Sequence, residues 1–531
     1  MEVSVNLPLL ISLSFVFVAI LGVLAWMGFK QTKSSADYLL AGQNVHPYLM
    51  AISYGAAFIS SSAIIGFGGL AGKFGMQMMW VVFLNIALGI IFAFLVFGKR
   101  MRKIGSNLGA QTFPDFMAKR YDSNFARWFS ALFIFVFMPF YAAAVLIGAA
   151  RFMEITFNMG FVIAVVIYTA IVAVYVITGG LKGVVYADAF LGTIMIGAGV
   201  FLVFSVYTQL GGVSAAHAEL AKLNSMIPPE LVKAGHQGLA AFPAFNSDIW
   251  WTSISSFMMA IGLGVLAQPQ LLVRFMTVKS GKELNRAVGI GSLFIFIVVG
   301  SAYLTGALSN VFFVKDVGKL AIQVANNNPD HIMAIFLNNT KFMPQWFVYV
   351  FLLSLLSAAI STSAAQFHTL GSSLGKDIVE DCLMKKPNTG TMLLWKRVGT
   401  FISIMIVFLL SVWLASVDKS GNGLVGVLTS FFFSLCSATF LPTIIGSLFW
   451  RGTTKAGVVA SIIVGLLVSL VYALFFNGKI AAGFGITPIL GKPWVYIDAG
   501  AVGLPFSLIT LFVVSSFTKK LPKEVVEKCF K

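Results

Sequence analysis

Eight hydroxyl side chains are gathered in one apolar stretch, SLLSAAISTSAAQFHTLGSS, at residues 354–373. Neutral oxygens of this kind suit a monovalent cation such as Na⁺, since divalent ions favour carboxylate ligands. Ser361 and Thr362 are adjacent, so on a helix their side chains lie about 100° apart and both reach one side. The alternative is that the hydroxyls bond back to the carbonyl four residues earlier or join neighbouring helices. The residue types alone leave both interpretations open.

A second stretch, AAFISSSAIIGFGG at residues 56–69, combines an apolar composition with three serines and then three glycines. Opening a helix inside a bilayer frees backbone carbonyls, and these must meet partners, water or an ion. We therefore expect the glycines to weaken this helix at its middle, so that carbonyls face a cation. The alternative is that the glycines only allow neighbouring helices to approach closely.

Other kinds of chemistry find little support in the sequence. The apolar runs hold no acidic residue near their centres, which argues against a proton relay built on buried carboxylates. The three cysteines have neither disulfide nor metal-ligand spacing. The five histidines are isolated, and no loop contains a nucleophile beside a base. The sequence therefore predicts no enzyme, no organic cofactor and no metal other than sodium.

The elements that must position these residues are membrane helices. Hydrophobic residues make up 58% of the 531 residues and charged residues only 10%, and the mean hydropathy is +0.91. Apolar runs of about 20 residues recur, each long enough to cross a hydrocarbon core about 30 Å thick. The pattern predicts an all-α, polytopic membrane protein. About thirteen spans are expected, at residues 7–29, 47–70, 78–98, 124–150, 160–179, 186–207, 250–272, 287–311, 345–377, 396–416, 424–450, 456–477 and 497–517.

The basic residues indicate an orientation for these spans. If the N-terminus is outside, 26 of the 36 lysines and arginines fall in cytoplasmic segments, as the positive-inside rule requires. The sequence thus predicts an N-out, C-in, multi-pass protein of the cell membrane, plasma or inner. Its formal charge of +17 then reflects topology in a lipid bilayer, and no nucleic-acid partner is expected.

An internal symmetry relates two of the spans. The segment SFMMAIGLGVLAQPQ at residues 256–270 lies five spans after residues 56–69 and also has glycines at its middle. Its Gln268-Pro269 pair frees backbone groups, because proline lacks an N–H. Five is an odd number, so the two segments cross the membrane in opposite directions. Inverted repeats with paired, interrupted first helices are typical of secondary transporters whose site lies near the midplane.

Three motifs carry a resemblance to the sodium/solute symporter family, which includes sodium/proline, sodium/pantothenate, sodium/monocarboxylate and sodium/glucose carriers. ITGGLKGVVYADAFLG at 177–192 looks like the family's Gly-Gly and Asp signature. LAQPQLLVRFM at 266–276 looks like its segment with Pro and Arg, and AAISTSAAQ at 358–366 looks like the segment that supplies sodium-binding hydroxyls. The resemblance covers essentially the whole chain. Each motif is weak alone, and together they are specific.

The resemblance implies a LeuT-like core of two inverted five-helix repeats. An N-terminal extra helix with the first cytoplasmic loop is expected at 1–46, the first repeat at 47–207 and an external loop at 208–249. The second repeat is expected at 250–450, and two C-terminal helices with a basic tail at 451–531.

The resemblance also implies a sodium site, carried over position by position. Sodium would be held by the backbone carbonyls and side-chain hydroxyls of five residues: Ala56, Ile59 and Ala358 through carbonyls, Ser361 and Thr362 through hydroxyls.

Three further residues are assigned by the same resemblance, with alternatives. Asp188 matches an aspartate on the ion's release path, and its alternative is an interfacial carboxylate at a helix start. Ser60 lies in the same expected unwound stretch and is a candidate oxygen either for a second ion or for the surroundings of the first. Arg274 matches an arginine at the inner mouth, and its alternative is a topology anchor.

The expected substrate pocket departs from that of several relatives. The resemblance places Phe58 where proline carriers have an aspartate, and Ile261 and Val265 where they have aromatic residues. FISSSAIIG looks closer to the pantothenate and monocarboxylate branches. Ser62 and Gln268 are assigned to the same pocket. Such a pocket suits an acid with a small or apolar body, whose carboxylate rests on N–H groups at the helix break.

The sequence therefore predicts a sodium-coupled symporter that imports a small organic monocarboxylate, such as pantothenate or a short-chain acid, by alternating access. The alternative within this class is a sodium/proline or other amino-acid symporter. A channel would need a polar stripe or a filter repeat, which we do not find. A membrane sensor would need a large signalling domain. The oligomeric state stays open, and a monomer is compatible with the sequence.

Overall fold

The computed structural model describes residues 7–31, 39–43, 45–383, 389–417, 423–483 and 485–530. Within these ranges some helical side chains are also left undescribed. Gly179 and Gly180 of the expected signature, and the thiol of Cys382, belong to that group and lie outside the description. The described chain is helical, and its only strand-like pairing is a single bridge between Val45 and Val278.

The longer helices carry most of the structure. They are α1 (Leu7–Gln31), α3 (Pro47–Phe58), α6 (Lys99–Leu108), α8 (Asn124–Phe157), α9 (Phe161–Gln209), α10 (Val213–Lys222), α15 (Gly281–Val317), α17 (Pro329–Asn338), α18 (Gln345–Ser372), α19 (Thr389–Val417), α20 (Leu424–Phe449), α21 (Lys455–Phe475) and α23 (Ala499–Phe517). Four π-helical segments continue or join them: η2 (Ser62–Phe67), η4 (Asn85–Gly98), η6 (Ser253–Met259) and η9 (Ser373–Leu383).

Short helices complete the fold. The α-helices among them are α4 (Gly68–Phe74), α5 (Met79–Leu84), α7 (Phe113–Tyr121), α11 (Pro229–Lys233), α12 (Asp248–Thr252), α13 (Ala260–Gly264), α14 (Pro269–Leu272), α16 (Ala321–Val324), α22 (Gly478–Gly483) and α24 (Lys523–Phe530). The 3₁₀ turns are η1 (Ala41–Gln43), η3 (Gly75–Met78), η5 (Leu223–Met226), η7 (Val265–Ala267), η8 (Val273–Met276) and η10 (Trp494–Tyr496).

Eleven helical stretches in the described chain are long and apolar enough to cross a membrane. They correspond to eleven of the thirteen expected spans. The other two differ for identifiable reasons. The span expected at 47–70 is interrupted, as described below. The span expected at 160–179 is represented by the shorter apolar stretch Phe161–Ala173 of helix α9, beyond which several side chains lie outside the description.

Both expected helix interruptions are present. Helix α3 ends at Phe58, and Ile59 has an extended backbone with φ −86° and ψ 109°. The chain becomes helical again at Ser61. In the second segment, η7 ends at Ala267, and Gln268 is extended with φ −72° and ψ 121° immediately before Pro269. The proline cannot continue the helix, because it lacks an N–H donor.

The glycines do not cause the first interruption, so our expectation for them is wrong. The break at Ile59 precedes Gly66, Gly68 and Gly69, which lie in η2 and α4. A Cβ at Gly69 would lie 1.9 Å from the carbonyl oxygen of Pro329 on α17. The alternative interpretation is therefore correct: these glycines allow close approach of neighbouring helices.

This packing leads to a test with a matched control. We expect Gly69→Ala to lower stability by about 1–3 kcal/mol, because the added methyl group collides with fixed backbone atoms. Gly289→Ala is the control, since a Cβ at this helical position of α15 meets nothing within 4 Å. Melting temperatures in detergent compare the two variants. Equal melting temperatures would contradict the close approach of α4 and α17.

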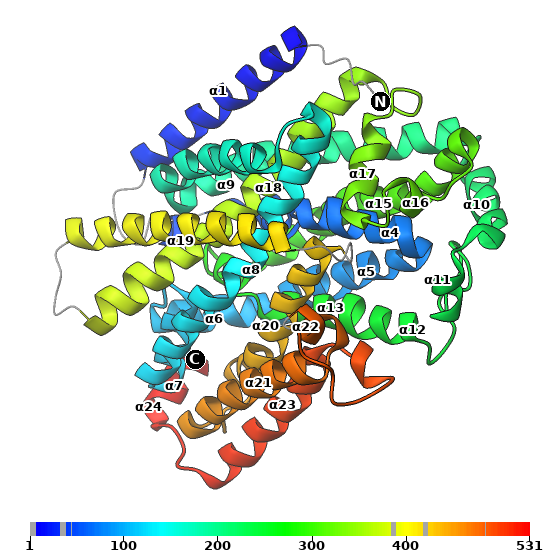
Figure 1. Ribbon diagram of the computed structural model, residues 1–531. Helices are drawn as coiled ribbons and strands as arrows, with labels where there is room; N and C mark the ends of the chain where they lie inside the picture. The colour runs from blue at the N-terminus through cyan, green and yellow to red at the C-terminus, as the bar shows by residue number, and fades with distance from the viewer. Residues whose placement is uncertain are drawn as a thin grey trace.

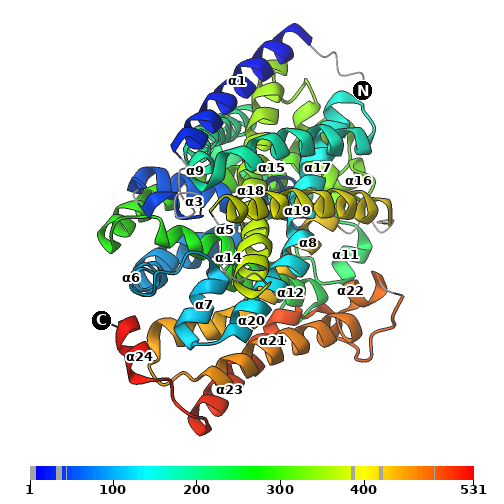
Figure 2. The ribbon, with the colours of Figure 1, turned by 90° about the vertical axis from the view of Figure 1, so that its left-hand side faces the viewer.

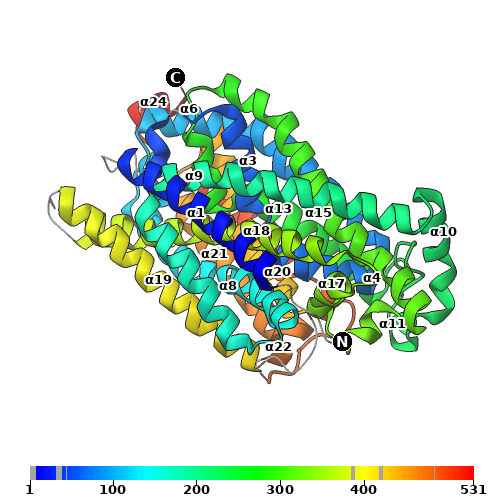
Figure 3. The same cartoon turned by 90° about the horizontal axis from the view of Figure 1, so that it is seen from above.

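The helices surround a central one. Helix α18 is almost fully buried and packs against α3, α8, α9 and α19. Helix α1 packs on α9 at one edge, while α21 and α23 pack together and on α20 at the opposite edge (Figures 1 and 2). Helices α6 and α24 gather at one end of the molecule, and α10 lies at the other (Figures 1 and 3). This arrangement places both helix breaks beside α18.

Candidate cation and solute site

The first helix break presents its carbonyls to α18. The hydroxyl of Thr362 lies 3.2 Å from the carbonyl oxygens of both Ala56 and Ile59, so its single proton is shared between them. Ala358, one turn earlier on α18, is fully buried. Three of the five predicted sodium-ligand residues therefore meet at one point through oxygens, because Ile59 leaves the helix there.

Ser361 points elsewhere, because adjacent residues on a helix diverge by about 100°. Its hydroxyl donates to Oδ1 of Asp188 at 2.6 Å. In this structure, then, the two predicted hydroxyl ligands serve different partners. The lone pairs of Ser361 stay available to a cation, since its proton is the only part that Asp188 uses.

Asp188 forms the centre of a buried charged cluster. It is 0% exposed, and Arg274, 2% exposed, donates from Nη1 to Oδ2 at 3.1 Å. Ser53 of α3 donates to the same oxygen at 2.6 Å. Arg274 also donates to Ser53. The cluster thus ties α3, η8 and α18 to α9 through one carboxylate.

This cluster corrects two alternatives raised by the sequence. An interfacial carboxylate or a topology anchor would be exposed at the headgroups, yet both Asp188 and Arg274 are buried. Burying an ion pair costs several kcal/mol per ion unless partners satisfy it. Two hydroxyls donate to Asp188 here, while Nε and Nη2 of Arg274 are buried with no partner among the described residues. Sequence reasoning identified each residue but not their pairing, because 86 residues separate them.

A small cavity lies on the other side of the helix break. Its volume is about 20 Å³, room for a single water. Phe58, Ser62 and Ile261, which we predicted for the substrate pocket, are among its lining residues. Ser60, which we assigned to a second ion, also lines it and shares a 2.5 Å hydrogen bond with Ser62. The structure thus places Ser60 at the cavity.

Two residues predicted for this pocket are not among its lining residues. Val265 packs near Gly89, close to the ring of Phe58, and is buried. Gln268 accepts a 2.5 Å hydrogen bond from Gln270, and its own Nε2 is buried without a partner in the described structure. Both therefore lie beside the second helix break.

Several lining residues were missed by sequence reasoning. They are polar groups from four other elements: Asn85, Tyr141, Tyr303 and Thr429. The Oδ1 atom of Asn85 is buried with no partner among the described residues. Of these four residues, only Asn85 could have been identified from the sequence, because a lone amide inside an apolar span is costly unless it has a binding partner. The tyrosines resembled ordinary core aromatics.

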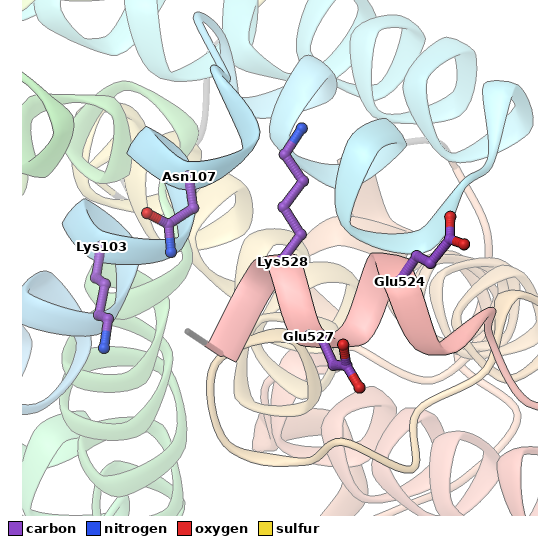
Figure 4. Close-up of a pocket in the computed structure, with 5 residues that line it drawn as sticks. All are labelled: Lys103, Asn107, Glu524, Glu527 and Lys528. Carbon is purple, nitrogen blue, oxygen red and sulfur yellow. The ribbon is translucent and has the colours of Figure 1, made fainter.

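Another cavity has none of these residues in its lining. It measures about 570 Å³ and is an open surface recess between α6 and α24. Charged and amide side chains surround it (Figure 4): Lys103, Asn107, Glu524, Glu527 and Lys528. Among the described residues, no group of three or more His, Cys, Asp and Glu side chains could hold a metal ion.

The sequence model of the sodium:solute symporter family matches residues 38–465. The chain belongs to the sodium:solute symporter family. Its homologues are transporters, which confirms the prediction of a multi-pass membrane transporter rather than an enzyme. Family membership also supports coupling to sodium.

Curated relatives match nearly the whole symporter. It is 28% identical over 522 residues to the osmoregulated proline transporter OpuE of Bacillus subtilis (strain 168), covering 98% of this chain and 96% of the relative. It is 27% identical over 471 residues to the sodium/pantothenate symporter of Haemophilus influenzae, covering 88% and 90%. The relatives therefore differ in the solutes that their names give.

Solved structures show the same fold. A Na⁺-coupled sialic acid symporter in a substrate-bound, outward-open state superposes with a TM-score of 0.75 at 16% identity, covering 97% of this symporter and 99% of that chain. MHP1, a nucleobase-cation-symport-1 family transporter, gives a TM-score of 0.52 at 15% identity, covering 94% and 99%. The all-helical fold is thus that of LeuT-type transporters.

Proposed function

We propose that this symporter imports a small organic monocarboxylate together with sodium, by alternating access around the first helix break. The proposal includes thirteen spans in an N-out, C-in orientation, with inverted repeats at 47–207 and 250–450. Interrupted helices at corresponding places in the two repeats support it, since such breaks hold ions and solutes in secondary transporters.

One observation carries the sodium part of the proposal. Thr362 meets the carbonyls of Ala56 and Ile59 at a buried break in the backbone. Sodium would take these oxygens with those of Ala358 and Ser361, while the Thr362 proton turns away. Asp188 would orient Ser361 and lie on the ion's release path.

The walls of the small cavity support the solute part. Its lining includes Phe58, Ile261 and Phe433 and contains no acidic or basic side chain. An uncharged wall favours a solute with an apolar body. The substrate carboxylate would rest on N–H groups where the helix resumes after Ser60, because the first N–H groups of a helix lack partners. Val265 and Gln268 would contribute when the second break moves.

A sodium/proline or other amino-acid symporter is the second candidate. The proline transporters among the relatives favour it. So does the unpartnered Oδ1 of Asn85, an acceptor that suits the ammonium group of an amino acid.

The driving force separates the two candidates. One Na⁺ crossing about 100 mV gains about 2.3 kcal/mol, and a tenfold gradient adds about 1.4 kcal/mol. One Na⁺ can therefore concentrate a zwitterion about 500-fold. A monoanion moving with one Na⁺ carries no net charge, so only about tenfold remains. Strong accumulation of an acid thus requires a second Na⁺.

Uptake into proteoliposomes tests this proposal. We expect sodium-dependent uptake of labelled pantothenate or a short-chain acid, stimulated by an inside-negative potassium diffusion potential. Labelled proline and glucose are the comparison solutes. Uptake of proline alone would favour the second candidate. Acid uptake that ignores the membrane potential would rule out the second Na⁺.

A further inference from the structure

A second cavity lies among the segments that we propose to be external. Its volume is about 160 Å³, eight times that of the small cavity at the helix break. Its walls come from α4, α11, α12, η6, the start of α20, α22 and η10. We call it the loop cavity. A water occupies about 30 Å³, so the loop cavity has room for several waters or a short-chain acid.

Two lysines line the loop cavity from opposite ends of the sequence. They are Lys73 at the end of α4 and Lys479 in α22. Neither ammonium group has a hydrogen bond or ion pair to another residue that the structure describes. Each lies near an aromatic ring instead, Lys73 5.4 Å from the centre of Phe74 and Lys479 6.0 Å from that of Phe257. Two cations therefore border one cavity, and neither is ion-paired with a residue that the structure describes.

The nearby acidic groups do not neutralise them directly. Asp248 also lines the cavity, but its carboxylate accepts a 2.5 Å hydrogen bond from Lys492. Glu230 of α11 acts on Lys73 only through its electrostatic field, and Asp498 acts on Lys479 in the same way. Asp248 is thus held by Lys492 through Oδ2, and the described structure gives it no ion pair with Lys73 or Lys479.

The two ammonium groups also interact electrostatically. Burial, helped by the positive charge of Lys73, lowers the pKa of Lys479 to about 8, while Asp498 opposes the shift. Repulsion between like charges in a confined space is relieved by an anion placed between them. A bound carboxylate would therefore reduce the repulsion between the two ammonium groups.

An aromatic contact separates the loop cavity from the small cavity at the helix break. Phe257 lines the loop cavity, and Phe67 lines the small one. Their rings meet edge to face with centres 6.0 Å apart. A solute leaving the loop cavity would thus need to pass this pair of rings to reach Phe58 and Ser60.

We propose that the loop cavity is a separate binding site for small organic carboxylates, held between Lys73 and Lys479 before the solute passes Phe67 and Phe257. The inference rests on the proposed import of a monocarboxylate and on the proposed orientation. It adds a site that attracts anions, so that the inner cavity needs no cationic side chain of its own.

Lysine footprinting of the full-length wild-type protein in lipid nanodiscs tests binding without transport. The protein is acetylated briefly at pH 8 with sulfosuccinimidyl acetate, in sodium propionate or in sodium chloride at equal ionic strength. Modification of each lysine is read by mass spectrometry. We expect propionate to protect Lys73 and Lys479 at least threefold relative to chloride. Lys233, which is exposed on α11 and does not line the loop cavity, serves as the control and should react equally in both salts.

A variant pair tests the same site by transport. We expect Lys479→Gln to raise KM for the transported acid about tenfold with little change in kcat, because it removes a charge-assisted hydrogen bond. Lys233→Gln removes an exposed charge that does not line the loop cavity and should leave KM within twofold. The loss should be confined to anionic solutes.

The outcomes separate this inference from the proposed function. Protection by propionate without acid transport would overturn the proposed function and keep the site. Acid transport with equal modification in propionate and chloride would overturn the site. An equal rise in KM for proline in Lys479→Gln would also overturn it, since the site then would not select anions. The footprint uses wild-type protein, so a misfolded variant does not remove the test.

Discussion

Asp188→Ala is expected to abolish uptake and to destabilise the protein by about 3–5 kcal/mol. Removing the carboxylate leaves Arg274 buried as an uncompensated charge, and the hydroxyls of Ser53 and Ser361 lose their acceptor. Melting temperature in detergent and sodium-driven uptake measure the two effects. Because this one carboxylate joins α3, η8 and α18 to α9, its loss loosens the contacts among all four elements at once.

Two further variants separate charge from packing. Arg274→Met alone should be as damaging to stability, because it strands Asp188 instead. The double variant Asp188→Ala/Arg274→Met should recover much of the lost stability, since no buried charge then remains, but it should not recover transport. Recovery of transport would show that the pair has only a structural role.

A surface ion pair provides the control for this experiment. Asp316 pairs with Lys341, and their side chains are 12% and 70% exposed. Exposed pairs are worth about 0–1 kcal/mol, so Asp316→Asn should hardly change the melting temperature. If Asp188→Ala and Asp316→Asn have the same melting temperature, the buried cluster contributes nothing to stability.

Thr362→Val should raise the sodium concentration for half-maximal uptake about tenfold or more. The substitution keeps the shape of the side chain and removes the oxygen that faces Ala56 and Ile59. Losing one oxygen ligand from a cation costs about as much as a hydrogen bond to a charged group, about 1.5–3 kcal/mol. The double variant Ser361→Ala/Thr362→Ala should raise the requirement further.

Two hydroxyls on the same helix serve as controls. Thr369 donates to the carbonyl of Ala365 and Ser357 to that of Leu353, each within α18. Thr369→Val and Ser357→Ala should leave the sodium dependence unchanged. An unchanged sodium dependence in the Ser361/Thr362 double variant would mean that the cation binds elsewhere.

The hydroxyls of α18 show how far local patterns lead. Sequence left two uses open for them, ion binding and bonding back to the carbonyl four residues earlier. The structure shows both kinds of geometry, since Ser357 and Thr369 bond back within the helix while Thr362 reaches across to another. Residue type is the same in each case, so only the direction of each side chain separates them.

The sequence by itself determined the apolar helices and the break before Pro269. Hydropathy is a local property, and Pro269 ends a helix through its own missing N–H, so neither depends on distant residues. Only the tertiary structure decided that Asp188 pairs with Arg274, that Gly69 admits the backbone of α17, and that Lys73 and Lys479 share a cavity. These relations join residues far apart in the chain, and the free energy of each depends on what folding places beside it.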